Sequence, residues 1–295
     1  MSITASMVKE LRERTGAGMM ECKKALVEAD GDMEKAVEVL RMSGQAKADK
    51  KSSRVAADGR IVIKSDASQA VIVEVNSETD FVAKDDNFIA FADAVADSIL
   101  AGKAADVDAL SNQKLADGRT VEAARTELVA KVGENISVRR FQRVPKRGNL
   151  GIYSHGARIG VIVSTDRGDV ELARDLAMHV AASNPVCIDD SGVPAETLER
   201  ERRIIVEQAA EQAAESGKPA NIVEKMVTGR IAKFLKEITL LGQPFVKDPE
   251  VTVAGMLQKA GARVTGFVRF EVGEGIEKKQ QNFAEEVMAQ VNQRA

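Results

Sequence analysis

The sequence has few of the features that mark secreted and membrane proteins. Its 295 residues include no Trp and one Tyr, and aromatic residues make up only 3%. The two cysteines, Cys22 and Cys187, lie far apart and outside any cysteine-rich pattern, which is typical of a reduced protein. The first residues lack the apolar core of a signal peptide, and no apolar run approaches the ~20 residues needed to span a bilayer. We therefore expect a cytoplasmic protein with no membrane partner.

Motifs for catalysis or cofactor binding are also missing. The sequence contains no Cys-x-x-Cys, His-Glu-x-x-His or Gly-x-Ser-x-Gly. Gly-Lys occurs at 102–103 and 217–218 without a following Ser or Thr, so there is no P-loop. The two histidines, His155 in a predicted turn and His179 on a predicted apolar helix, fit structural or interface roles. We expect no catalytic residue, metal or cofactor, and an enzyme with an unrecognised site is a remote alternative.

The charge balance argues against a large nucleic-acid interface. There are 42 Lys and Arg against 45 Asp and Glu, for a net charge of -3. Nucleic-acid binding normally needs a basic face, so we expect no direct nucleic-acid partner. The rival hypothesis is an RNA-binding translation protein that uses one of two basic stretches: Lys47, Lys50, Lys51 and Arg54, or Arg139, Arg140, Arg143, Lys146 and Arg147.

The N-terminal residues 1–46 have the pattern of a small helical module. Apolar residues recur at helical spacing in three short segments, which Thr15-Gly-Ala-Gly18 and Asp30-Gly-Asp32 separate. Three short helices bury a core only when their faces converge, so we expect a compact bundle. Residues 47–55 are charged and without periodicity, which predicts a solvated linker.

From residue 56 the pattern changes to strands alternating with helices, and the order occurs twice. Residues 56–144 and 145–275 each have two strand patterns, an apolar helix and a closing strand. This order predicts an α+β protein built from two related core subdomains with antiparallel or mixed sheets. The second copy contains an insertion, at about 194–238, whose two helical stretches predict an antiparallel helical hairpin. Residues 276–295 predict a C-terminal helical module.

The segment Asn76-Ser-Glu-Thr-Asp-Phe-Val-Ala-Lys84 lies between a strand pattern and a helix pattern. Such a connection is normally polar because its backbone needs water, yet this one carries Phe81. One interpretation is that Phe81 completes its own core while Asp80 caps the following turn, because Phe is usually buried. The other is that Phe81 docks into a partner protein.

Several long motifs extend over essentially the whole chain. They are Leu11-Arg-Glu-Arg-Thr-Gly-Ala-Gly-Met-Met-Glu-Cys-Lys-Lys-Ala-Leu26, Asn76 to Lys84, His155-Gly-Ala-Arg-Ile-Gly-Val161, Met178-His-Val-Ala-Ala182, Gly242-Gln-Pro-Phe245 and Gly266-Phe-Val-Arg-Phe-Glu-Val-Gly-Glu-Gly-Ile-Glu277. These motifs resemble those of the elongation factor Ts family, and the resemblance implies that the N-terminal helical module is UBA-like.

The resemblance implies a guanine-nucleotide exchange factor that binds elongation factor Tu, both GDP-bound and nucleotide-free, and performs no covalent chemistry. It implies that Thr79, Asp80, Phe81 and Val82 wedge against the GTPase domain of that partner and disturb the elements that hold Mg²⁺ and phosphate. Further candidates for partner contact are Arg12, Met19, Met20, His155 and His179.

Overall fold

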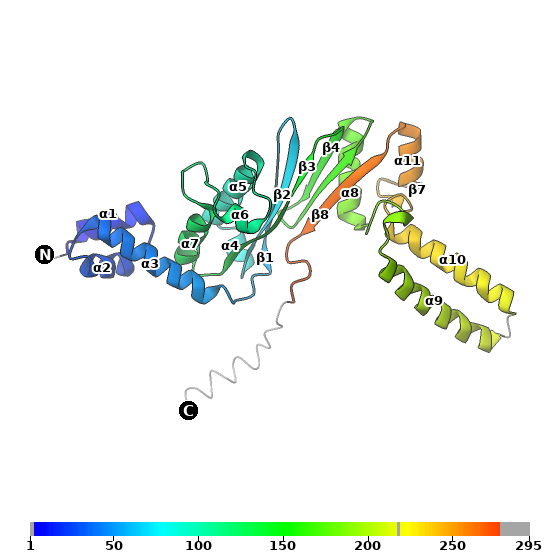
Figure 1. Cartoon of the computed structure of the whole chain (residues 1–295), viewed down its shortest axis with the longest axis horizontal. Coiled ribbons are helices and arrows are strands. Elements are labelled where there is room, and N and C mark those ends of the chain that lie inside the picture. The colour runs from blue at the N-terminus through cyan, green and yellow to red at the C-terminus, as the bar shows by residue number, and fades with distance from the viewer. Residues whose placement is uncertain (1–2, 217–218, 278–295) are drawn as a thin grey trace, which may run out of the picture. The chain divides into compact units, whose positions relative to one another are not determined.

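A computed structural model describes residues 3–216 and 219–277 of this chain, and it confirms the α+β class (Figure 1). Contacts divide the chain into two compact units. Of the described residues, the first comprises 3–64, Val71–Gln142 and 270–277, and the second comprises Ser65–Ala70 and Arg143–Arg269. The predicted C-terminal helical module at 276–295 lies outside the described residues beyond Glu277. No helix in the described ranges is both long and apolar enough to cross a bilayer.

The predicted N-terminal helices are present as α1 (Ala5–Thr15), α2 (Met19–Glu28) and α3 (Met33–Lys51). The side chain of Thr4 caps α1 by accepting the Met7 N–H, and Asp32 caps α3 by accepting the N–H groups of Glu34 and Lys35. Each cap satisfies backbone donors that a helix leaves unpaired at its start. The three helices converge on one apolar cluster, whose buried members include Leu11, Cys22, Leu26 and Ala36.

The expectation of a solvated linker at 47–55 is wrong for its first half, because α3 continues to Lys51. Ala48 is buried in the core cluster of the first unit, while Lys47 pairs with Glu21 and Lys51 donates to the carbonyl oxygen of Gly133. The charged residues therefore lie along a helix that packs on the first unit. The sequence contains no residue here that would break the helix, and charge alone does not do so.

The first unit contains a three-stranded sheet with the order β1 (Asp58–Ser65), β2 (Gln69–Ser77), β3 (Ile136–Pro145). Helices α5 (Asp86–Ala101) and α7 (Val121–Val132) supply most of the apolar side chains that pack against it, and the short α6 (Val107–Ser111) lies between them in sequence. β2 is buried along most of its length because it is the central strand. The core cluster includes Val71, Val73, Val75, Phe88, Val95, Ile99, Leu128, Val129 and Ile136.

The second unit repeats this order with β4 (Asn149–His155), β5 (Ile159–Thr165) and β8 (Val264–Glu271) in one sheet. β4 and β5 are antiparallel, with Ile152 opposite Ile162. Helix α8 (Val170–Ser183) lies so close to β4 that a Cβ at Gly151 would be 1.9 Å from the carbonyl oxygen of Ala173. Only glycine permits that approach. A second small sheet, β6 (Pro244–Phe245) with β7 (Asp248–Thr252), and α11 (Val253–Ala260) complete the unit.

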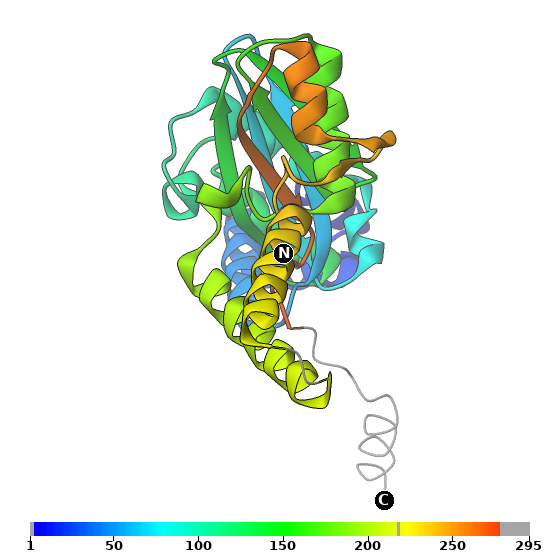
Figure 2. The same cartoon turned by 90° about the vertical axis from the view of Figure 1, so that its right-hand side faces the viewer.

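The predicted helical hairpin is confirmed as α9 (Ala195–Ser216) and α10 (Ala220–Ile238), which run side by side in both views (Figures 1 and 2). Ile205 and Ala209 of α9 are buried, whereas α10 has no buried residue. The hairpin is therefore held by a narrow apolar seam, and most of its surface is solvated.

Candidate partner-binding site

The connection from β2 to α5 folds as a one-turn helix, α4 (Asp80–Ala83). Thr79, in extended conformation, caps this helix by accepting the N–H of Val82 at 3.4 Å. Ala83 is buried and Val82 packs against the core of the first unit. These two residues fix one side of α4 to the core, so the opposite side faces solvent.

Phe81 lies on that solvent-facing side and is 82% exposed. The interpretation that Phe81 completes its own core is therefore wrong. Burying a Phe side chain is worth roughly 1.5–3 kcal/mol, and this chain gains almost none of it within its own fold. A large apolar residue held out on a capped turn is suited to binding a surface on another molecule.

Asp80 does not cap the following turn, which was part of the interpretation that buried Phe81 in its own core. Thr79 caps α4, and Asp85 caps α5 by accepting the N–H groups of Asn87 and Phe88. Asp80 instead pairs with Lys84, with 2.6 Å between Oδ2 and Nζ, and this hydrogen bond lowers the pKa of Asp80. Both charged side chains of this pair are exposed, like the ring of Phe81.

The stem of the connection is tied to residues that follow α7. Glu134 accepts hydrogen bonds from both the backbone N–H and the hydroxyl of Thr79, and Glu78 accepts one from the backbone N–H of Asn135. Ser77 also donates its hydroxyl to the carbonyl oxygen of Thr79, at 2.9 Å. Residues more than fifty positions apart thus meet here, and no local pattern in the sequence signals the pairing.

The other predicted contact residues fall into two groups. Arg12, Met19 and Met20 are exposed on α1 and α2, in the same unit as Phe81. His155 belongs to the second unit, where it ends β4 opposite Ile159 and its Nδ1 lies 3.3 Å from the hydroxyl of Tyr153. These four side chains are accessible to a partner.

His179 is fully buried and offers no surface to a partner. Its Nδ1 accepts the backbone N–H of Val246 at 3.2 Å, so the neutral ring donates from Nε2 to the side-chain oxygen of Gln243 at 3.0 Å. Burial lowers the pKa of His179, although the bond to Gln243 opposes the shift. Gln243 also donates to the carbonyl oxygen of Glu237 at the end of α10. His179 therefore acts in packing the base of the hairpin.

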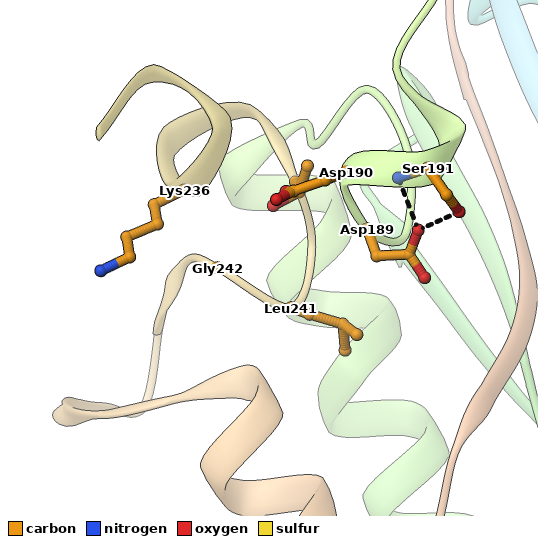
Figure 3. Close-up of a pocket in the computed structure, with 7 residues that line it drawn as sticks. Asp189, Asp190, Ser191, Lys236, Leu241 and Gly242 are labelled. Carbon is orange, nitrogen blue, oxygen red and sulfur yellow. Dashed lines mark hydrogen bonds between the residues drawn. The ribbon is translucent and has the colours of Figure 1, made fainter. Parts of the chain in front are cut away.

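A surface pocket of about 500 Å³ lies near the base of the hairpin (Figure 3). Asp189 accepts hydrogen bonds from the backbone and hydroxyl of Ser191, and Lys236 extends away from the two aspartates. These contacts cap a short turn, and they assemble no reactive set. Across the described residues there is no group of three or more His, Cys, Asp or Glu side chains that could hold a metal ion.

The basic stretches of the RNA-binding hypothesis are partly engaged in structural contacts. Lys47 pairs with Glu21, and Lys51 binds the carbonyl oxygen of Gly133. Arg139 and Arg140 both bind the carboxylate of Glu74. These cations stabilise the fold, which leaves fewer of them for phosphate groups.

Comparison with known proteins identifies one family. The family model described as elongation factor Ts matches residues 78–274. The protein named "Elongation factor Ts" from Thioalkalivibrio sulfidiphilus is 63% identical over 294 residues, which cover 98% of this chain and 99% of that protein. The proteins of the same name from Methylococcus capsulatus and Alkalilimnicola ehrlichii are 61% and 59% identical over nearly the same span. This chain belongs to the elongation factor Ts family.

Proposed function

We propose that this chain is a guanine-nucleotide exchange factor that binds elongation factor Tu in its GDP-bound form and promotes replacement of GDP by GTP during translation elongation. Membership of the elongation factor Ts family supports this activity. The place of action is the cytoplasm, where the partner works. The chain performs no covalent chemistry in this reaction and requires no cofactor of its own.

The exposure of Phe81 is the single observation that carries the mechanism. The ring is held out on α4, whose other side is fixed by Val82 and Ala83. On docking, Phe81 enters the partner's GTPase domain and displaces the elements that hold Mg²⁺ and phosphate, with Thr79, Asp80 and Val82 completing the contact. Mg²⁺ bridges nucleotide phosphates and protein ligands, so its displacement weakens the binding of GDP.

Exchange by this route is a linkage effect between two binding reactions. The chain binds the nucleotide-free partner more tightly than the GDP-bound partner, and GDP and the chain therefore weaken each other by the same factor. Neither an acid nor a base is needed for this coupling. Arg12, Met19 and Met20 supply a second area of contact from the N-terminal helices, and His155 is a candidate contact in the second unit.

The direct test is release of labelled GDP from elongation factor Tu in the presence of Phe81→Ala. We expect exchange to slow by at least about tenfold, equivalent to roughly 1.4 kcal/mol. The free energy of unfolding should stay within about 0.5 kcal/mol of the parent value, because an exposed side chain contributes little to the folded state.

Val170→Ala is a matched control, because Val170 is also an exposed apolar residue at the start of a helix but lies in the second unit. It should leave the exchange rate unchanged. Normal exchange by Phe81→Ala would show that the ring is not the wedge. Early unfolding of Phe81→Ala, by about the 3–5 kcal/mol of an emptied core site, would contradict the exposure of the ring.

A further inference from the structure

Glu134 grips the start of the Phe81 turn through both of its carboxylate oxygens. Oε2 accepts the backbone N–H of Thr79 at 3.0 Å, and Oε1 accepts the Thr79 hydroxyl at 2.7 Å. Hydrogen bonds to an ionised carboxylate are stronger than those between neutral groups. The two bonds fix the position of the Thr79 backbone and the rotation of its hydroxyl.

The rotation of the Thr79 hydroxyl matters because the same oxygen caps α4. With its proton donated to Glu134, the hydroxyl oxygen presents a lone pair to the N–H of Val82. α4 has only four residues, and a single helical turn is unstable alone because nucleation costs more than one hydrogen bond returns. The helical turn that carries Phe81 therefore depends on its cap, and the cap is oriented by Glu134.

A reciprocal bond completes the connection between the two segments. Glu78, which precedes Thr79, accepts the backbone N–H of Asn135 at 2.6 Å. The side-chain amide of Asn135 donates to the carbonyl oxygens of Ser52 and Arg54, at 3.3 and 2.8 Å. Residues 78–79 and 134–135 thus hold each other, and the pair is tied to the segment that follows α3.

Glu134 owes its own position to the end of α7. Gly133 ends that helix with φ of +83° and lies in the left-handed region that favours glycine. The carbonyl oxygen of Gly133 also accepts the hydrogen bond from Lys51. The backbone next to Glu134 is therefore anchored to two helices, α3 and α7, whereas the turn that its carboxylate holds is short and exposed.

We propose that Glu134 is a positioning residue for nucleotide exchange: it holds Thr79 so that α4 is formed and Phe81 is aimed before the partner arrives. This inference rests on the proposed wedge role of Phe81. A preformed contact residue spares the partner the cost of ordering the turn during binding. Without Glu134, the chain docks through its other contacts, but Phe81 occupies its working position for a smaller fraction of the time.

The test uses the full chain with Glu134→Ala and Glu134→Gln, and it combines two measurements. The first is amide hydrogen exchange at Thr79 to Lys84 in the free protein. The second is the dependence of GDP release from elongation factor Tu on the concentration of the chain. For Glu134→Ala we expect the Thr79 amide to exchange at least about tenfold faster. The saturating rate of GDP release should fall about three- to tenfold, with the half-saturating concentration changed less than about twofold.

The matched variants separate positioning from general destabilisation. Glu134→Gln keeps the volume and one acceptor, so its effects should be intermediate. Thr79→Val removes the hydroxyl and should speed amide exchange in the turn as Glu134→Ala does. It is read by amide exchange in the free protein alone, because Thr79 itself belongs to the proposed partner contact. Asp66→Ala is the control, because Asp66 likewise accepts the N–H and hydroxyl of one residue, Ser68, but in the turn between β1 and β2. It should leave GDP release unchanged.

Three results would overturn the positioning role. One is an unchanged Thr79 amide in Glu134→Ala, which would show that other contacts hold the turn. Another is faster amide exchange in the turn of Glu134→Ala together with a normal saturating rate of GDP release, while Phe81→Ala remains slow. The proposed function would then stand without this inference. The third is normal exchange by Phe81→Ala itself, which would remove both. Should Glu134→Ala fail to fold, Glu134→Gln decides by the same criteria.

Discussion

The connection from β2 to α5 and the connection from β5 to α8 occupy corresponding places in the two copies of the core. The strands before them are alike: Val71-Ile-Val73 and Val161-Ile-Val163 have the same residues, all buried. The second connection is Asp166-Arg-Gly-Asp169, in which Asp166 pairs with Arg263 and Asp169 caps α8. These contacts only hold the connection in place and cap the helix that follows it. The first adds a helical turn and an exposed Phe81, a feature that folding does not require.

A second difference lies inside the sheets. Glu74 of β2 is 0% exposed, and the corresponding position in β5 is Ser164. The carboxylate of Glu74 accepts hydrogen bonds from the backbone of Gly273, the side chain of Asn76, and both Arg139 and Arg140. Gly273 adopts φ of +74°, and a Cβ there would be 2.2 Å from the carbonyl oxygen of Ala57. The first copy thus uses the buried carboxylate of Glu74 to hold the segment after β8. The second copy has the uncharged Ser164 at this position.

The largest effect is expected from removing that charge. Glu74→Ala should lower the free energy of unfolding by about 3 kcal/mol, because it leaves Arg139 and Arg140 without their buried partner. Ser164→Ala, at the corresponding half-buried position, should change it by less than about 1 kcal/mol. Urea denaturation of both variants measures the contrast. Equal losses would show that the two copies do not differ at this position.

The pH dependence of stability in Glu74→Gln tests whether the charge of Glu74 is responsible for this difference. Burial alone would raise the pKa of Glu74, but the bonds from Gly273, Asn76 and Arg140 together hold it below the ordinary value. A carboxylate with a depressed pKa stabilises the fold above its unfolded pKa of about 4.3, and that contribution is lost as the pH falls further. The stability gap between the parent chain and Glu74→Gln should therefore narrow below about pH 4. A gap that stays constant down to pH 3 would contradict this.

A somewhat smaller effect is expected in the second copy from His179→Ala. The substitution leaves a cavity and removes the partners of Gln243 and of the Val246 N–H, which together should cost about 2–3 kcal/mol. Because the pKa of His179 is lowered in the fold, its contribution is complete above the unfolded value of about 6.5 and is lost as the pH falls. Urea denaturation at pH 7.5 and 5.5 should therefore show a smaller difference between parent and variant at the lower pH. A larger difference at pH 5.5 would mean that the ring is charged in the fold.

Periodicity predicted most of the helices, the two hairpins of strands and the helical hairpin, because each depends on residues close in sequence. Periodicity failed to predict the helix at 47–51, where α3 continues because Ala48 is buried in the core cluster of the first unit. The candidate site was predicted in part. Phe81 was identified as an apolar residue in a polar segment, but its exposure depends on Val82 and Ala83 facing the core. Glu134 and Gln243 were not identified, since their bonds join residues about sixty positions away.

The two units also differ in their appendages. The N-terminal helices join the first unit through α3, where Gly44 is buried against α7: a Cβ there would lie 3.6 Å from that of Ala130. A chain that starts at Ala56 should remain folded, but we expect it to bind elongation factor Tu about tenfold more weakly, roughly 1.4 kcal/mol. Calorimetry measures this, and unchanged affinity would remove the contact role of Arg12, Met19 and Met20. Loss of Ala48 from the core should also lower stability, so circular dichroism must first confirm the fold.

The smallest effect is expected from shortening the hairpin of the second unit. Replacement of Ala210 to Val223 by a short Gly-Ser turn keeps Ile205 and Ala209, the buried residues of α9. The entropy of closing a loop changes slowly with its length, so stability should fall by no more than about 1 kcal/mol. GDP release should continue at close to the parent rate, because Phe81 belongs to the other unit. Complete loss of exchange in a variant that remains folded would show that the tip of the hairpin contacts the partner. The assignment of exchange to the first unit alone would then be wrong.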